Sequence, residues 1–146
     1  MKKINLVDFL RTIRKGRTYY LKIDTMEIVN PHKYIERQIK DFDKMTLEEK
    51  NNLIFPSYEE LNIYELPSYE EINHIEIMRF YVKNCIIDTK IRKELFDTLR
   101  NHNYIDKFND VLKKYDLQDE YMNVSSFYYQ SIIEEWLDKN NIKLNW

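Results

Sequence analysis

Glycine and alanine are almost missing from this chain of 146 residues, which contains one glycine and no alanine. Phosphate-binding loops and dinucleotide-binding turns need several glycines at fixed spacings, because their backbone must approach a phosphate closely. The composition therefore excludes both classes of site. It also leaves asparagine and aspartate to occupy most turns and helix ends that require a positive φ angle.

Cysteine is equally scarce, since Cys85 is the lone cysteine and has no partner for an internal disulfide. The three histidines, His32, His74 and His102, lie far apart, with no cysteine spaced to complete a zinc site. The chain shows no basic leader followed by an apolar segment and no apolar run of about eighteen residues. We therefore expect a cytoplasmic protein that has no metal or other cofactor and does not associate with a membrane.

Hydrophobic residues make up 43% of the chain and charged residues 33%, as in an ordinary globular domain. Apolar residues recur at three- and four-residue spacing in the segments 6–13, 34–42, 72–86, 91–99, 105–115 and 124–137. The fold class expected is mainly α (α+β), with a small antiparallel β-hairpin near the N-terminus and a C-terminal helical bundle. We expect one domain over residues 1–146, in which 1–65 form a helix, the hairpin and short helices, and 66–146 form a four-helix part.

The hairpin is predicted from residues 18–29, which are rich in β-branched and aromatic side chains. Residues 24–26 form the reversal between 19–23 and 27–29. Helix starts are predicted where Asn30 precedes a proline and where Thr46 precedes a glutamate by three positions. The motif Pro-Ser-Tyr-Glu-Glu occurs at 56–60 and again at 67–71, and two capping boxes are a simpler interpretation than a phosphorylated docking repeat.

Four large aromatic residues fall on the apolar stripes of the C-terminal helices, namely Phe96, Phe108, Phe127 and Trp136. We expect them to form the centre of the C-terminal core. The terminal Trp146 follows two further apolar residues, and we expect it to pack on the body of the same chain.

The order of motifs in the second half of the chain resembles that of the bacterial uncharacterised protein family UPF zero-one-five-eight. The matching segments are Leu66-Pro67-Ser68, Ile77-Met78-Arg79-Phe80-Tyr81, Ile91-Arg92-Lys93-Glu94-Leu95-Phe96, residues 103–110 and residues 133–142. An opening helix, Tyr19-Tyr20-Leu21 and Glu27-Ile28-Val29 extend the resemblance to the N-terminal part. The family has an arginine-rich segment that corresponds to residues 104–110 of this chain. Phe108 and Asp110 are the two residues of this chain that match it. The family has no assigned function, so the resemblance implies no site residue.

Residue types that catalyse reactions occur in incomplete arrangements. Glu71-x-x-His74 resembles half of a di-iron site, but the second copy and the further glutamates are missing, so we expect an exposed His74 on a solvated helix face. Ser125 and Ser126 lack the glycine-flanked turn of a serine nucleophile. Cys85 lies on an apolar stripe, where a buried thiol is inert. An enzyme is disfavoured, and an enzyme with an unrecognised site stays an alternative.

Charge is distributed unevenly along the chain. Residues 1–22 contain seven lysines or arginines and one acid, whereas residues 41–76 contain ten acids and two bases. The basic segment is a candidate nucleic-acid-binding face formed by Arg11, Arg14, Lys15 and Arg17, with Tyr19 and Tyr20 available to stack on bases. A pI near 6.0 favours neutralisation within the fold instead.

Aromatic residues make up 14% of the chain, more than a core requires, and aromatics are enriched at interfaces. Because every catalytic arrangement in the sequence is incomplete, the leading hypothesis is a non-catalytic binding or protein-interaction module with an unidentified protein partner. The alternative is a weak nucleic-acid binder that uses the basic N-terminal segment.

Charge reversal at Arg11, Arg14 and Arg17 tests the nucleic-acid alternative. If the segment binds nucleic acid, phosphate contacts dominate, so affinity falls steeply with salt and the triple reversal abolishes binding. Fluorescence anisotropy with labelled RNA and with single- and double-stranded DNA measures this at about 50 mM salt. Absence of binding by the unaltered protein under those conditions would contradict the alternative.

Overall fold

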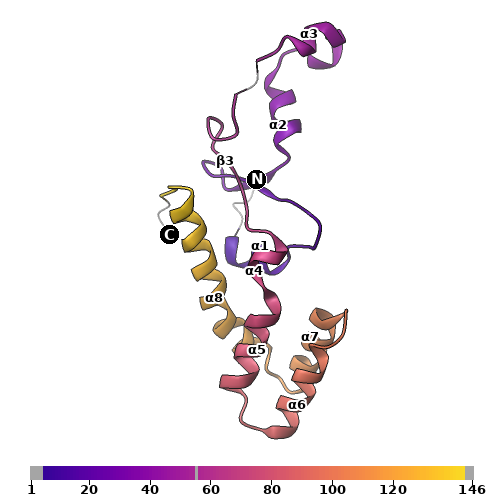
Figure 1. The fold of residues 1–146 in the computed structure, drawn as a ribbon, viewed down its shortest axis with the longest axis vertical. Coiled ribbons are helices and arrows are strands. Elements are labelled where there is room, and N and C mark those ends of the chain that lie inside the picture. Colours follow the sequence, from indigo (N-terminus) through magenta and orange to yellow (C-terminus); the bar gives the residue numbers. More distant parts are fainter. Residues whose placement is uncertain (1–4, 55, 144–146) are drawn as a thin grey trace.

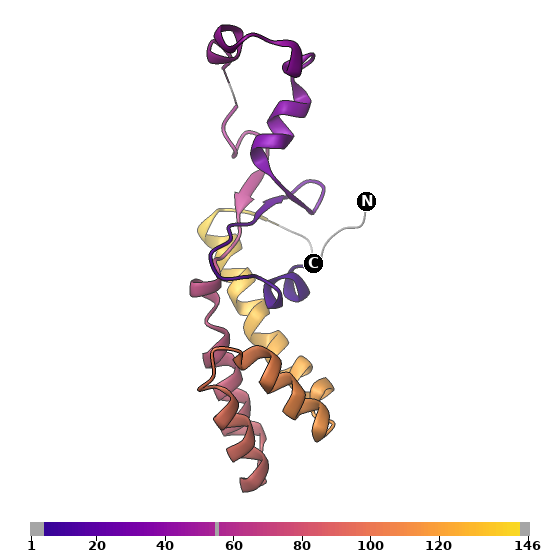
Figure 2. The ribbon, with the colours of Figure 1, turned by 90° about the vertical axis from the view of Figure 1, so that its right-hand side faces the viewer.

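The structure is a computed structural model that describes residues 5–54 and 56–143. Its elements, in chain order, are α1 (Leu6–Arg11), β1 (Tyr20–Lys22), β2 (Glu27–Val29), α2 (Pro31–Gln38), the 3-10 helix η1 (Phe42–Lys44), α3 (Leu47–Asn51), β3 (Ile63–Glu65), α4 (Tyr69–Ile72), α5 (His74–Cys85), α6 (Thr89–Thr98), α7 (Tyr104–Lys114) and α8 (Gln118–Lys139). The molecule is elongated, with α2 and α3 at one end, α6 and α7 toward the other, and the sheet and α1 between them (Figures 1 and 2). The expected mainly α fold with a small antiparallel β element is confirmed.

The sheet has the strand order β2-β1-β3, and both pairs are antiparallel. Leu21 at the centre of β1 lies opposite Ile28 on one side and Tyr64 on the other, and its side chain is buried. The predicted hairpin is therefore confirmed, and Met26 supplies the positive φ, 55°, that a glycine often supplies in such a turn. Strand β3 was not predicted, because three residues between loops are too short to show an alternating pattern.

Side-chain caps define several helix starts as the sequence predicts. The Asn30 side chain accepts a hydrogen bond from the Lys33 amide at the start of α2, and Thr46 forms a capping box with Glu49 at the start of α3. The two Pro-Ser-Tyr-Glu-Glu segments differ in outcome. Ser68 opens α4 through a capping box, whereas Ser57 accepts a hydrogen bond from the Glu60 amide, 3.2 Å long, within a turn.

The capping box at Ser68 and the apolar pattern of residues 72–86 together predict one continuous helix, but the structure divides it in two at Asn73. This residue adopts the left-handed conformation, with φ 53° and ψ 64°, and ends α4. Its side chain then accepts a hydrogen bond from the Glu76 amide and so caps α5. Because Asn tolerates this conformation better than most residues, it can serve both helices without a glycine. The C-terminal part therefore contains α4 to α8, one helix more than the four expected, within the described residues.

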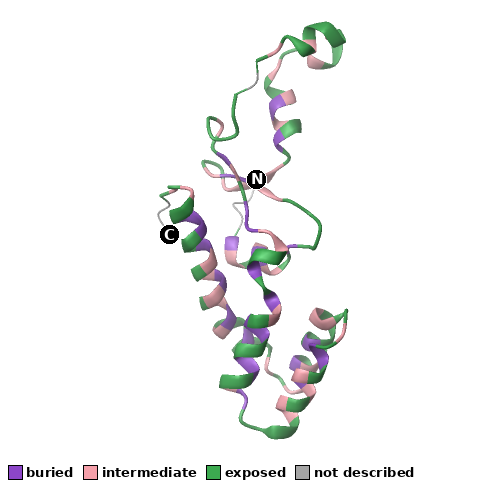
Figure 3. Ribbon diagram, in the orientation of Figure 1, coloured by how far each residue is buried: buried purple, intermediate pink, exposed green. Residues whose placement is uncertain are grey.

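Two clusters of buried side chains lie along the molecule, on the inward faces coloured purple in Figure 3. The first joins α1, β1, α4, the start of α5 and the second half of α8, and its members are Leu6, Leu10, Ile13, Leu21, Leu66, Ile72, Ile77, Tyr129, Ile133, Trp136 and Leu137. The second joins α5, α6 and α7 to the start of α8 through Met78, Tyr81, Val82, Ile86, Leu95, Leu99, Phe108, Leu112 and Tyr121. The indole nitrogen of Trp136 also donates a 2.7 Å hydrogen bond to the Glu65 carbonyl and ties α8 to β3.

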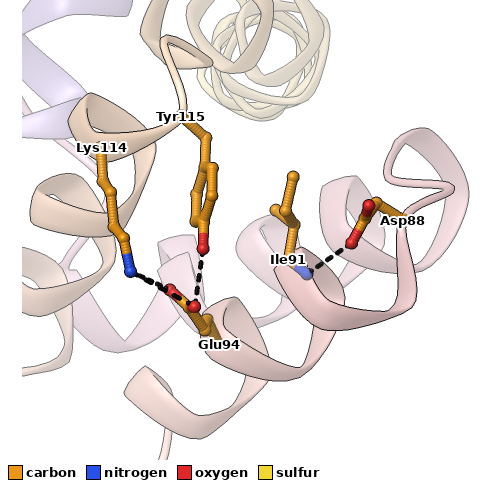
Figure 4. A network of polar contacts seen from close by, with 5 residues as sticks. All are labelled: Asp88, Ile91, Glu94, Lys114 and Tyr115. Atoms are coloured by element: carbon orange, nitrogen blue, oxygen red, sulfur yellow. Dashed lines mark hydrogen bonds and ion pairs between the residues drawn. The ribbon is translucent and has the colours of Figure 1, made fainter.

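Helices α6 and α7 are joined by polar contacts as well as by this second cluster (Figure 4). The hydroxyl of Tyr115 donates a 2.6 Å hydrogen bond to the carboxylate of Glu94, and Lys114 lies 3.2 Å from the same carboxylate. The side chain of Asp88 caps α6 by accepting hydrogen bonds from the Lys90 and Ile91 amides. These contacts orient the end of α7 over α6.

The prediction that four aromatic residues form the centre of one C-terminal core is only partly confirmed. Phe108 is buried in the second cluster and Phe96 is half-buried against it, whereas Trp136 is buried in the first cluster. Phe127 is 76% exposed, because the buried face of α8 lies two positions away and includes Ser125 and Tyr129. The apolar pattern of the sequence therefore predicted the wrong inward face for α8. The prediction for Trp146 lies outside the described residues.

Phe108→Ala should lower the free energy of unfolding by about 3–5 kcal/mol, because the 0% exposed ring leaves a cavity in the second cluster. Phe127→Ala is the matched control and should change stability by less than about 0.5 kcal/mol. Urea unfolding followed by circular dichroism measures both. Equal effects of the two substitutions would contradict this assignment of the core.

Candidate functional site

The side chain of Arg11 joins α1 to α8. One terminal nitrogen, Nη1, donates a 2.7 Å hydrogen bond to the hydroxyl of Ser125. The other, Nη2, donates to the Ser126 hydroxyl at 2.8 Å and to the Met122 carbonyl at 2.9 Å. The guanidinium carbon also lies 4.6 Å from the ring centroid of Tyr129. All these partners are neutral, so a half-buried cation is held by hydroxyls, a carbonyl and an aromatic face.

His74 is the first residue of α5, and it is buried with 3% of its surface exposed. Its Nδ1 atom lies 2.7 Å from the hydroxyl of Tyr129, which is itself buried. The other ring nitrogen, Nε2, has no hydrogen-bond partner among the described residues, and neither does the Nε atom of Arg11. Burial, and then the positive charge of Arg11, lower the pKa of His74 to about 4. The imidazole is therefore neutral near pH 7.

The prediction that His74 is exposed is wrong. The prediction that His74 and Glu71 share one helical face is wrong as well. The break at Asn73 turns His74 inward as α5 begins. Glu71 instead completes the capping box of Ser68, and its carboxylate accepts a 3.2 Å hydrogen bond from the Ser68 amide. The spacing Glu-x-x-His places two side chains on one face only when the helix is continuous.

Arg11 and His74 line a pocket of about 310 Å³ between α1, α5, α7 and α8. Its remaining lining residues are Met78, Ile105, Asn109, Leu112, Lys113, Gln118, Tyr121, Met122 and Tyr129. No aspartate or glutamate lines it among the described residues. The pocket therefore combines two cationic side chains, Arg11 and Lys113, with amide and phenol groups and an apolar wall.

The phenols in this region stay protonated. Burial raises the pKa of Tyr121 to about 12, and burial also raises the pKa of Tyr129. The hydroxyl of Ser125 donates to the Tyr121 carbonyl at 2.6 Å while it accepts from Arg11, so its proton is not directed at a base. A neutral imidazole whose pKa is near 4 is a weak base. The arrangement offers hydrogen-bond donors and positive charge, which suit binding better than proton transfer.

The candidate nucleic-acid residues are divided by the fold. Arg14, Lys15 and Arg17 are exposed, whereas Arg11 points inward to α8. The edge of the Tyr19 ring packs on Phe9 with centroids 5.2 Å apart, and Tyr20 packs on Tyr58 at 5.6 Å. Both tyrosines thus have aromatic partners within the chain. None of these contacts tests nucleic-acid binding itself.

An apolar groove of about 790 Å³ lies between α5 and α8. Its apolar lining residues are Ile72, Ile77, Phe80, Phe96, Tyr128 and Ile132, and its charged lining residues are Glu76, Arg79, Lys83 and Glu135. The ring centroids of Phe80 and Tyr128 lie 4.7 Å apart, so these two lining side chains contact each other and join α5 to α8. This groove was not predicted from the sequence, because Phe127, which lies beside it on α8, was expected in the core.

Other reactive groups do not assemble into a centre. Burial and the nearby Glu120 carboxylate raise the pKa of the Cys85 thiol, which disfavours the reactive thiolate. In the part of the chain that the structure describes, no three His, Cys, Asp or Glu side chains lie close enough to hold a metal ion. None of the helices within 5–54 and 56–143 is long and apolar enough to cross a membrane.

The fold and site define a mainly helical domain with a donor-rich pocket and a separate apolar groove. No family model matches the chain, and neither a curated protein nor a solved structure matches it. The resemblance to UPF zero-one-five-eight therefore stays a prediction. The function has to be argued from the residues of the site.

The depressed pKa of His74 makes stability depend on pH. The unfolded chain binds a proton at this imidazole near its usual pKa of 6.5, whereas the folded protein binds it only near pH 4. Stability is therefore fully present above pH 6.5 and is lost as pH falls toward 4, by up to about 3 kcal/mol. His74→Ala should flatten this slope. It should also cost about 2–4 kcal/mol at pH 7.5, because it leaves a cavity and an unpaired Tyr129 hydroxyl.

Urea unfolding at several pH values between 4 and 7.5 measures both effects. His102→Gln is the control, because His102 is exposed and does not line the pocket. An equal slope in the parent protein and in His74→Ala would contradict the assignment.

Proposed function

We propose that the protein is a non-catalytic binding module that holds an amphipathic helix of a partner protein in the groove between α5 and α8. The main support is the set of large apolar side chains that the fold leaves exposed beside this groove. Phe127 is 76% exposed and Phe80 is 42% exposed. Apolar surface gathered around a groove is typical of an interaction site.

The spacing of residues on α8 fits this mode of binding. Phe127, Ser131 and Glu135 follow one another at four-residue intervals, so they lie in one row along the helix. Ser131 and Glu135 line the groove, which places Phe127 beside it. A helix lying in such a groove would bury its apolar face against Phe80, Tyr128 and the exposed Phe127 ring. Charged groups of both signs at the rim would fix its direction.

The large surface of the molecule also supports a partner. A monomer of 18.1 kDa with a compact shape exposes about 8,000 Å². This chain exposes 10558 Å². The difference exceeds the roughly 800 Å² that each side of a standard interface buries. An elongated domain of this kind has area available for a partner without losing its own core.

The two alternatives have less support. Of the six residues proposed to bind nucleic acid, three are exposed cations, namely Arg14, Lys15 and Arg17. The other three, Arg11, Tyr19 and Tyr20, have partners within the chain. An enzyme with an unrecognised site would need a proton acceptor that works near neutral pH, and His74 is a weak one.

Affinity capture of binding proteins from cells that express this protein tests the proposal, with Phe127→Asp as the variant. A charge at this exposed position should leave the melting curve unchanged and weaken partner binding at least tenfold, because it would be desolvated in the groove. Ile54→Asp is the matched control, since Ile54 is 97% exposed and lies in the loop after α3, whereas Phe127 shares its row on α8 with the groove residues Ser131 and Glu135.

The expected result is a protein that the parent and Ile54→Asp capture and Phe127→Asp does not, with or without nuclease. Capture that nuclease abolishes would favour the nucleic-acid alternative. Capture that is equal for all three proteins would contradict the groove.

A further inference from the structure

We infer that the pocket between α1, α5, α7 and α8 binds a small organic anion, with a carboxylate placed against Arg11 and His74 and an apolar body against Met78, Ile105 and Leu112. No residue lines both this pocket and the groove of the proposed function. Ligand binding in the pocket can therefore be tested independently of partner binding in the groove.

The first reason is the charge of Arg11. Its guanidinium is half-buried, and its recorded partners are two hydroxyls, one carbonyl and one aromatic ring. A cation removed from water is costly unless an opposite charge lies near it. The Nε atom is buried and has no acceptor in the described part of the chain. A carboxylate in the pocket would supply the negative charge that the protein does not place beside this cation.

The second reason is the free nitrogen of His74. His74 is 3% exposed, Nδ1 is engaged by the Tyr129 hydroxyl, and Nε2 lacks a partner within the described residues although His74 lines the pocket. When the Tyr129 hydroxyl donates to Nδ1, the ring proton resides on Nε2, an atom that is itself fully buried. A buried donor without an acceptor is destabilising, so a carboxylate in the pocket that draws the imidazole toward it would satisfy this donor.

The third reason is the composition of the wall. Lys113 adds a second cation from α7, and Asn109 and Gln118 add amide groups, whereas no acid of the described residues lines the pocket. Met78, Ile105 and Leu112 form an apolar side that a fully hydrated ion would not use. A volume of about 310 Å³ lies at the lower end of the range for ligand pockets. The site therefore fits a small anion with an apolar body.

Benzoate is a suitable probe, and benzamide is its neutral counterpart of nearly the same shape. Titrations of the full chain followed by NMR, with shifts assigned to the residues around the pocket, should show saturable benzoate binding below about 10 mM. Benzamide should bind at least tenfold more weakly, because it lacks the charge that Arg11 requires. Inorganic phosphate should bind more weakly than benzoate, because it has no apolar body.

Variants locate the site. Arg11→Met should weaken benzoate binding at least tenfold, and Lys113→Gln about two- to fivefold, as expected for a partly solvated charge. Lys83→Gln removes a charge that lines the groove instead and should leave benzoate binding unchanged. Because Arg11 also joins two helices, Arg11→Met is used only if its circular dichroism matches that of the parent. Lys113→Gln and the benzamide comparison decide the question without it.

Equal binding of benzamide and benzoate would overturn the inference, as would phosphate binding more tightly than benzoate. No saturable benzoate binding by the folded parent would also overturn it. Because Phe127→Asp lies outside the pocket, it should bind benzoate normally. If Phe127→Asp loses partner capture but still binds benzoate, the groove and the pocket are independent sites. The same conclusion follows if Lys113→Gln weakens benzoate binding but still captures the partner.

Discussion

The guanidinium of Arg11 adds a polar connection between α1, α5 and α8, three helices that also meet in the first apolar cluster. It extends from α1, binds two serine hydroxyls and a carbonyl of α8, and lies over the ring of Tyr129. The hydroxyl of Tyr129 then contacts His74 at the start of α5. Ser125 and Tyr129 are buried, and the hydroxyls of Ser125 and Ser126 also donate to the Tyr121 and Met122 carbonyls, so the cation belongs to a connected polar network. Arg11 thus reinforces the packing of α1 on α8 and, through Tyr129, its link to α5.

This junction lies where the two apolar clusters meet. Tyr129 belongs to the first cluster and Tyr121 to the second, and both line the pocket together with Arg11. A ligand held there would contact residues of both clusters. Because a ligand that binds only the folded state stabilises it, occupation of this pocket would strengthen the connection between the two halves of the molecule. The groove, in contrast, uses the outer faces of α5 and α8 and leaves this connection untouched.

Local signals in the sequence were sufficient for much of the fold. Caps such as Asn30 and Thr46 act within three residues of themselves, and the hairpin of residues 20–29 is closed by its own turn. Features that depend on tertiary contacts could not be predicted in this way. The third strand pairs with a strand about forty residues earlier, and the inward face of α8 is set by what packs on Ser125 and Tyr129.

The candidate site was missed for a related reason. Arg11 and the serines at 125 and 126 are 114 and 115 positions apart in the chain, so no spacing rule joins them. The inward turn of His74 follows from the left-handed conformation of Asn73, and a helical periodicity assumes that the helix continues. His74 is a polar residue that is buried, and Phe127 is an apolar residue that is exposed. Phe127 lies outside the core because Ser125 and Tyr129, whose polar groups have hydrogen-bond partners, occupy the inner face of α8.

The turns of this fold affect its unfolded chain as well as its folded shape. Residues other than glycine hold positive φ angles at Met26, Asp41, Asn62, Asn73, Asp116 and Asn141. Each conformation is strained in the folded protein, by roughly 1–2 kcal/mol for an ordinary side chain and by less for asparagine or aspartate. The same side chains restrict the unfolded backbone, which glycine would leave freer by about 0.4–1 kcal/mol per position. Strain at the reversals is thus partly offset by a smaller loss of conformational entropy on folding, and a chain with one glycine still forms sharp turns.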